Sequence, residues 1–272
     1  MGRRRWSVGL LAIACACKPE PGPLEAPTEA QPQQAFDDLV HLQERLDAIE
    51  RQGREIYLRD SLAATAGDEL VAAIDRLAEG WRPIGWLTWL EPQPWRVEII
   101  GVHEDAVAVV FRVDFSSGER PVAEVVDPPA PLSAEAQRRW EARQLAVEDY
   151  SPRCTATVNP VVMPAGDEGW MVYLLPGTTD PSARIVGGHV QVWVGPDGAV
   201  REAAPLTRTC MIQQADAPAG GGLAAIMVSH VLTDHPRENH VFASLLYGIP
   251  IFVRTESHLW KVEEGHISVV ED

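Results

Sequence analysis

The sequence predicts an α+β protein with an N-terminal helical hairpin, then an antiparallel β-meander, then a helix packed on a curved antiparallel sheet. Three observations predict this order. Apolar residues recur every three or four positions before residue 80, and they alternate with polar residues between residues 96 and 126. After residue 154, short runs typical of strands are separated by turn residues.

The helical hairpin is expected over residues 35–80. A second helix is predicted to begin near Asp68, which can cap its N-terminus, and to stop at Gly80. We expect both helices to pack on the following sheet, whereas a coiled-coil contact with a partner or a second copy is the alternative. The first helix has Gly53 in one seam position of an apolar stripe that contains Leu39, Leu42, Leu46, Ile49 and Ile56.

The β-meander is expected over residues 81–130. Three strands are predicted there, at residues 96–102, 107–115 and 120–126, and the prolines that follow Asp127 are expected to end the last one. Four tryptophans crowd the first part of this region and are expected to fill the junction between helix and sheet. The alternative is a module that stacks cell-wall glycans on Trp86 and Trp89.

Residues 131–272 are predicted to form an α+β domain with an antiparallel sheet. Ser133 caps a helix that runs to Val147, with Trp140 as its anchor in the core. The rest of the chain is expected to be β-structure. Strands are predicted at residues 157–163, 170–175, 188–194, 199–204, 224–232, 249–255 and 259–268, and at His240–Leu246. The pattern does not decide whether the β-rich regions before and after this helix form one sheet or two.

The N-terminus has the charge order of an export signal. Arg3, Arg4 and Arg5 precede a short apolar run that ends in Ala-Cys-Ala-Cys17. This segment resembles the signal of bacterial lipoproteins, in which a small-residue box is cut and the next cysteine carries lipid. The resemblance covers residues 1–17 and implies lipid attachment at Cys17, with Cys15 as the alternative.

Residues 18–34 are rich in proline and almost free of apolar side chains, which favours a disordered tether. By the same resemblance, the body is expected to face the periplasm on a lipid anchor, in the outer membrane rather than the inner one. Export also makes Cys154 and Cys210 a predicted disulfide, because two cysteines left over in an oxidising compartment most simply pair.

The chain is strongly acidic, with a formal net charge of −16 over 272 residues. This charge is repelled by phosphate backbones and anionic headgroups, so nucleic-acid binding is disfavoured and membrane contact depends on the lipid. The same charge favours a basic protein partner.

Three histidines, His230, His235 and His240, lie close together with acidic residues between them. On paired strands of a hairpin they would converge and could bind zinc as a metal-dependent hydrolase does, although their spacing matches no helical zinc-protease motif. An ordinary polar turn is the simpler interpretation, and we expect no cofactor. The sequence thus favours a non-catalytic envelope lipoprotein that binds a protein partner, such as an immunity or inhibitor protein against a basic toxin or hydrolase.

Overall fold

A computed structural model describes residues 32–116, 120–150, 154–215 and 222–270, with side chains from residue 40 onward. The chain divides into two compact units, Met1–His41 and Leu42–Asp272. The first contributes only the first turns of helix α1 to the described residues. The signal at residues 1–17 and the tether as far as residue 31 lie outside them, whereas residues 32–34 belong to α1 instead of the tether.

The predicted helical hairpin is wrong in one respect, because residues 35–71 form one helix. Helix α1 (Pro32–Val71) runs without a break and is followed only by a 3-10 turn, Ile74–Arg76. Asp68 therefore lies inside a helix instead of at the start of one. No proline interrupts the span, and the apolar spacing continues through Leu62 and Ala66, both of which are buried.

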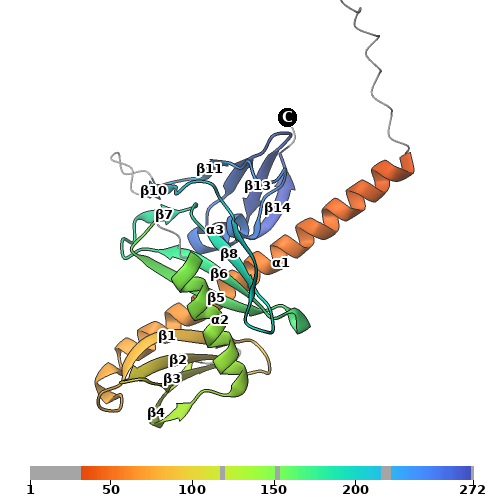
Figure 1. Cartoon of the computed structure of the whole chain (residues 1–272). Coiled ribbons are helices and arrows are strands. Elements are labelled where there is room, and N and C mark those ends of the chain that lie inside the picture. The colour runs from red at the N-terminus through yellow and green to blue at the C-terminus, as the bar shows by residue number, and fades with distance from the viewer. Residues whose placement is uncertain (1–31, 117–119, 151–153, 216–221, 271–272) are drawn as a thin grey trace, which may run out of the picture. The chain divides into compact units, whose positions relative to one another are not determined.

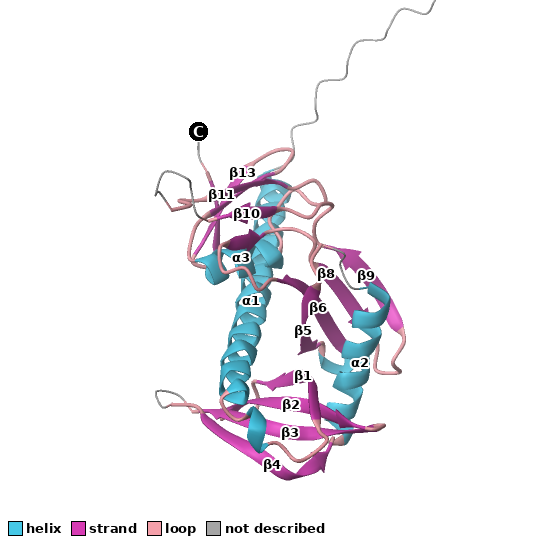
Figure 2. Ribbon diagram, turned by 90° about the vertical axis from the view of Figure 1, so that its left-hand side faces the viewer, coloured by secondary structure: helices cyan, strands magenta, loops and turns pink. Residues whose placement is uncertain are grey.

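Helix α1 contacts three sheets in turn, as Figures 1 and 2 show. Leu46 and Ile49 pack into the core of the C-terminal sheet (β11–β14). Ile56 lies in the core of the central sheet (β5, β6, β8 and β9), and Leu62 and Ala66 lie in that of the meander sheet (β1–β4). One apolar stripe thus joins parts of the chain that are distant in sequence.

The meander sheet has four antiparallel strands in the order β1-β2-β3-β4, namely Arg82–Trp89, Trp95–His103, Ala106–Phe115 and Val122–Pro131. The expected meander is confirmed, but the tryptophan-rich stretch forms its first strand, β1. The last strand also continues through Pro128 to Pro131. Prolines are tolerated there because β4 is an edge strand, whose outward N–H groups need no partner strand.

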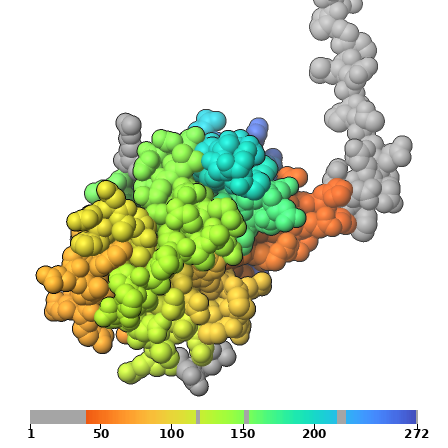
Figure 3. All heavy atoms as spheres, turned by 60° about the horizontal axis from the view of Figure 1, so that its bottom comes forward, coloured from red at the N-terminus to blue at the C-terminus, as the bar shows by residue number. Residues whose placement is uncertain are grey.

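Helix α2 (Ala134–Tyr150) lies between the meander sheet and the central sheet. The central sheet has the antiparallel order β5-β6-β8-β9, namely Thr157–Pro164, Trp170–Gly177, Val190–Val194 and Val200–Pro205. Trp140 of α2 packs with Leu87 of one sheet and Val172 of the other. Figure 3 shows these segments side by side on one face, coloured from yellow through green to turquoise.

The C-terminal sheet has the order β11-β12-β13-β14, namely Ile226–Ser229, Ile251–Arg254, Leu259–Glu263 and His266–Val269. The first pair is parallel and is joined by helix α3 (Glu238–Tyr247). The prediction of a strand at His240–Leu246 and of an all-antiparallel set is therefore wrong. His240 explains the helix, because its ring accepts a hydrogen bond from the backbone N–H of Arg237, as a capping residue does.

Three smaller elements complete the described chain. Strands β7 (Ala183–Ile185) and β10 (Ile212–Gln214) form an antiparallel pair, and a 3-10 turn covers Gly166–Glu168. Within the described ranges, no helix combines the length and apolarity that crossing a bilayer requires. The α+β class is confirmed.

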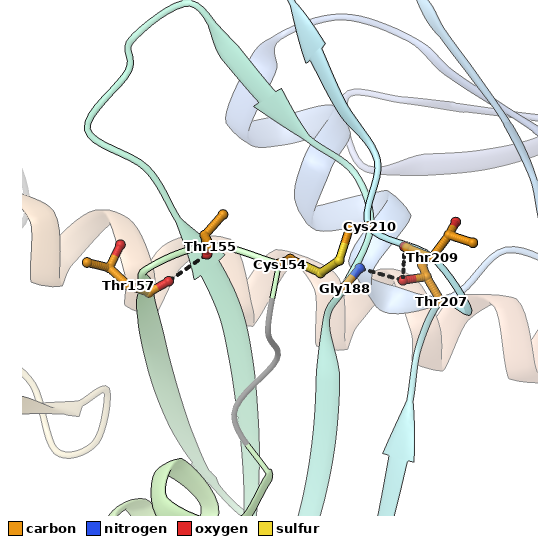
Figure 4. The surroundings of a disulfide bond; sticks show 7 residues. All are labelled: Cys154, Thr155, Thr157, Gly188, Thr207, Thr209 and Cys210. Atoms are coloured by element: carbon orange, nitrogen blue, oxygen red, sulfur yellow. Dashed lines mark hydrogen bonds between the residues drawn. A yellow bond between two sulfur atoms is a disulfide. The ribbon is translucent and has the colours of Figure 1, made fainter.

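The predicted disulfide is present. Cys154 follows α2 and Cys210 follows the β8–β9 hairpin, and their Cα atoms are 5.5 Å apart. Figure 4 shows the bond beside Gly188, whose N–H donates to Thr207 Oγ1 at 2.6 Å. Gly188 has a φ of +84°, and a Cβ at this position would meet the sulfur of Cys154. The loop carrying Cys210 is therefore held against the start of β8.

Candidate functional site

The edges of a sheet expose unpaired backbone groups, and proteins usually cover them. In the meander sheet, the Thr88 carbonyl of edge strand β1 accepts hydrogen bonds from Arg59 Nη1 at 2.9 Å and Arg139 Nη1 at 3.2 Å. In the C-terminal sheet, the Ile267 N–H of edge strand β14 donates to Glu50 Oε1 at 2.8 Å. Buried or half-buried side chains from α1 and α2 thus cap both strands.

Strand β11, at the opposite edge of the C-terminal sheet, has no such cover among the residues that the structure describes. Ile226 N donates to Pro250 O at 3.0 Å and His230 N donates to Arg254 O at 2.8 Å. Because backbone groups alternate in direction along a strand, Met227 and Ser229 turn their N–H and C=O groups away from β12. No side chain or backbone group of the described ranges hydrogen-bonds to the backbone of either residue.

A cavity of about 490 Å³ lies along this open edge. Residues 227–232 form one wall, and the disulfide-held loop at residues 207–211 contributes the other. The side chains of Met227 and Val231 project at the edge with 62% and 64% of their surface exposed. Apolar side chains at that exposure beside unpaired backbone groups are typical of a surface that receives another chain.

His230 and His240 form the buried part of this cavity. Their rings meet edge to face, with centroids 5.0 Å apart. His240 Nδ1 accepts the hydrogen bond from Arg237 N at 2.9 Å, so its proton is on Nε2. His230 Nε2 lies 2.9 Å from Thr233 Oγ1. Both rings therefore support the loop that leads from β11 into α3.

Burial keeps these imidazoles neutral. It lowers the pKa of His230 to about 4, with a further contribution from the charge of Arg237. It lowers the pKa of His240 well below 6.5, and His230 and His189 add to the effect. Two neutral rings packed edge to face in the interior stabilise the fold and do not supply a general acid near neutral pH.

A polar network behind the histidines was not found by sequence reasoning. Arg237 donates through Nε to Glu238 Oε2 at 3.0 Å, and Tyr173 Oη lies 3.3 Å from Glu238 Oε1. Gln191 donates to Tyr173 Oη at 2.9 Å. Glu238 is only 1% exposed, so this network fixes the start of α3 to strands β6 and β8. Tyr173 occupies an ordinary core position of its strand, and nothing in the pattern marks its partners.

The structure brings His230 and His240 together but does not bring all three predicted metal ligands to one point. His240 lies on α3 instead of on a strand paired with His230, and His235 Nδ1 lies 2.9 Å from the carbonyl of Pro236. Across the described ranges, no group of three or more His, Cys, Asp or Glu side chains is placed to hold a metal ion. The metal-dependent hydrolase therefore gains no geometric support, and zinc at these residues stays a prediction for elemental analysis.

The two predicted glycan-binding tryptophans have different surroundings. The Trp89 ring lies under Arg139, 3.9 Å from the guanidinium carbon, and its Nε1 donates to Glu98 at 3.1 Å. Trp86 instead contributes to a second cavity between α1 and β1. Trp89 does not line this cavity. The predicted lipid-attachment residues, Cys17 and Cys15, lie outside the described residues.

No family model matches the chain, nor does any curated protein or solved structure. Its function is therefore inferred from the site itself.

Proposed function

We propose that this protein is a non-catalytic lipoprotein of the cell envelope, anchored through Cys17, that binds an extended segment of a protein partner. The observation that carries the proposal is the uncovered edge of β11. Met227 and Ser229 point two N–H and two C=O groups at a cavity of about 490 Å³, while other sheet edges are capped by Arg59, Arg139 and Glu50.

The proposed binding mode is β-strand addition. An added strand would gain main-chain hydrogen bonds from Met227 and Ser229, and its alternate side chains would enter the cavity. The rigid far wall, held by the disulfide at Cys210, lowers the cost of ordering the site. The partner is expected to be basic, because the chain carries a net charge of −16 and complementary charge speeds encounter.

Proline substitution tests this binding mode. Met227→Pro removes an N–H that faces the open edge and leaves the β11–β12 hydrogen bonds in place. Val269→Pro is the matched control, because Val269 is half-exposed at the opposite edge of the same sheet and pairs with Trp260 without a ladder hydrogen bond of its own.

The measurement is the amount of partner captured from envelope extract by immobilised protein. The wild type and Val269→Pro are expected to capture the same partner at low salt, and Met227→Pro is expected to capture at least about tenfold less, since it removes main-chain contacts at the centre of the site. Equal capture by all three proteins would reject strand addition at β11.

A further inference from the structure

Two further cavities meet at Asp60 of α1 and Asn159 of β5. The first, of about 430 Å³, lies between α1 and edge strand β1, and Trp86 contributes to its wall. The second, of about 350 Å³, continues toward α3 and β7. Both volumes fall in the range of small-molecule sites. Because Asp60 and Asn159 line both cavities, the carboxyl group stands at their junction.

The first cavity is apolar apart from this pair of side chains. Small residues on α1 leave room for it, and a Cβ added at Gly67 would meet no atom within 4 Å. The apolar lining includes Ala63, Ala64, Leu70, Ile84, Trp86 and Ile99.

The Asp60 carboxylate has few partners that could stabilise its negative charge. Its hydrogen bond is a long one, in which Asn159 Nδ2 donates to Oδ1 at 3.4 Å. The neighbouring Arg59 is directed at Glu55 and Thr88. Arg184, in the second cavity, donates to the carbonyls of Pro181 and Ala183. No described cation forms an ion pair with Asp60.

We propose that this cleft binds a small organic cation with an apolar body. Its ammonium group would pair with the Asp60 carboxylate and with the amide oxygen of Asn159. Its apolar part would lie against Trp86 and the small residues of α1. A site with one uncompensated carboxylate and apolar walls selects this combination of charge and shape.

The energetics of Asp60 support the proposal. Burial raises the pKa of Asp60 to about 6, which means that its ionised form is held without sufficient solvation or pairing. A bound cation would supply the missing partner and return the pKa toward its usual value. His189, in the second cavity, is 1% exposed, and its Nδ1 has no partner among the described atoms.

Other ionisable groups do not interfere near neutral pH. Burial lowers the pKa of His189 to about 4 and raises that of Tyr247. Asp180, at the rim of the second cavity, has its pKa lowered by hydrogen bonds from Ser182. Asp60 is thus the group of this cleft that changes charge between about pH 5 and pH 7.5.

The experiment is calorimetric titration of the full chain with 2-phenylethylamine, a cation with an apolar ring, and with 2-phenylethanol, its neutral counterpart. We expect the amine to bind more tightly at about pH 7.5. Its affinity should fall about tenfold at about pH 5, because a carboxyl with a pKa of about 6 is only about one-tenth ionised there. The alcohol should show no such change.

Two variants complete the test. Asp60→Asn keeps the shape of the side chain and should abolish both the preference for the amine and its pH dependence. Gly67→Leu fills the cavity without changing charge and should abolish binding, while circular dichroism confirms that the chain is folded. Equal affinity for the amine and the alcohol, unchanged pH dependence in Asp60→Asn, or no amine binding to the wild type would each overturn the proposal.

Discussion

Gly53 of α1 lies directly against the side chain of Val241 of α3. A Cβ added at Gly53 would stand 2.5 Å from Val241 Cγ1 and 2.8 Å from the carbonyl oxygen of Glu238. This contact brings the two helices close together at the first turn of α3. It therefore holds in place the start of α3, where His240 lines the cavity beside β11 and accepts a hydrogen bond from the Arg237 N–H.

The same helix provides a matched pair of glycine substitutions. Gly53→Ala is expected to lower the free energy of unfolding by about 1–3 kcal/mol, since the overpacking exceeds the gain in helix propensity. Gly67→Ala is expected to raise it by up to about 1 kcal/mol, because a methyl group there meets no other atom. Urea unfolding of the two variants measures both effects.

An identical change in the two variants would show that α1 and α3 are not in contact at Gly53. A stabilising effect of Gly53→Ala would have the same meaning.

Stability is expected to fall as the pH falls from about 6.5 toward 4. The pKa values of His189 and His230 in the folded chain are about 4, below the 6.5 of an unperturbed histidine. Their contribution is therefore complete above pH 6.5 and is lost as the unfolded chain takes up protons. For the fully buried His189 this shift corresponds to about 3 kcal/mol.

His240 acts in the same direction, because burial lowers its pKa well below 6.5. His240→Gln isolates the contribution of this one histidine. Glutamine at the third helical position keeps an acceptor for the Arg237 N–H but does not titrate. Thermal unfolding of this variant should show a shallower loss of stability between about pH 6.5 and 4 than the wild type. Asp60 opposes the loss in both proteins, because its pKa is raised to about 6 and its protonation favours the folded state. An equal slope for variant and wild type would contradict the neutral, buried state of His240.

The disulfide is expected to contribute about 4 kcal/mol through the loop it closes, on the chain-entropy account. Its cysteines are 56 residues apart in the sequence. Cys154→Ala combined with Cys210→Ala should lower the urea midpoint of unfolding accordingly.

The double variant should also capture less partner, because the cavity wall at residues 207–211 loses its attachment. Wild-type protein reduced in urea should unfold at the same midpoint as the double variant, and a clear difference would mean that the substitutions act elsewhere.

Cys17→Ala tests the proposed anchor. The wild type is expected in the membrane fraction and should incorporate labelled palmitate. The variant should incorporate no label. It should either keep its signal peptide uncleaved or leave the membrane fraction. Cys15→Ala serves as the control and should behave as the wild type does. Loss of label from Cys15→Ala alone would move the attachment to Cys15.

The periodicity of the sequence predicts most of the strands but not the way in which the chain connects them. Short apolar runs bounded by turn residues predict β5, β6, β8 and β9 within a few residues, although β5 and β6 are buried without a clear alternation. The prediction fails at His240–Leu246, where apolar residues suit a strand as well as a buried helix. In the structure the hydrogen bond from the Arg237 N–H to His240 favours the helix over the strand. The sequence does not predict this bond, because histidine is not a typical capping residue.

The candidate sites illustrate the same limit. The segment from Ser229 to His240 is conspicuous in the sequence, and the structure places its first residues, Ser229 to Leu232, at the open edge. The feature on which the proposed binding depends is the direction of the backbone N–H and C=O groups of Met227. The type of residue at this position does not predict that direction. Asp60 is one of many charged residues on a long helix, and only its position beside Asn159 of β5 reveals its isolation. Contacts between residues 99 positions apart leave no local signal.

Amide hydrogen exchange at β11 tests the central claim most directly. Exchange of the Met227 and Ser229 N–H groups in labelled full-length protein is measured by nuclear magnetic resonance with and without the captured partner. Both amides should exchange rapidly in the free chain and slow at least about tenfold in the complex, while Val228, bonded to β12, stays protected throughout. Partner binding that leaves Met227 and Ser229 in rapid exchange would contradict strand addition at this edge.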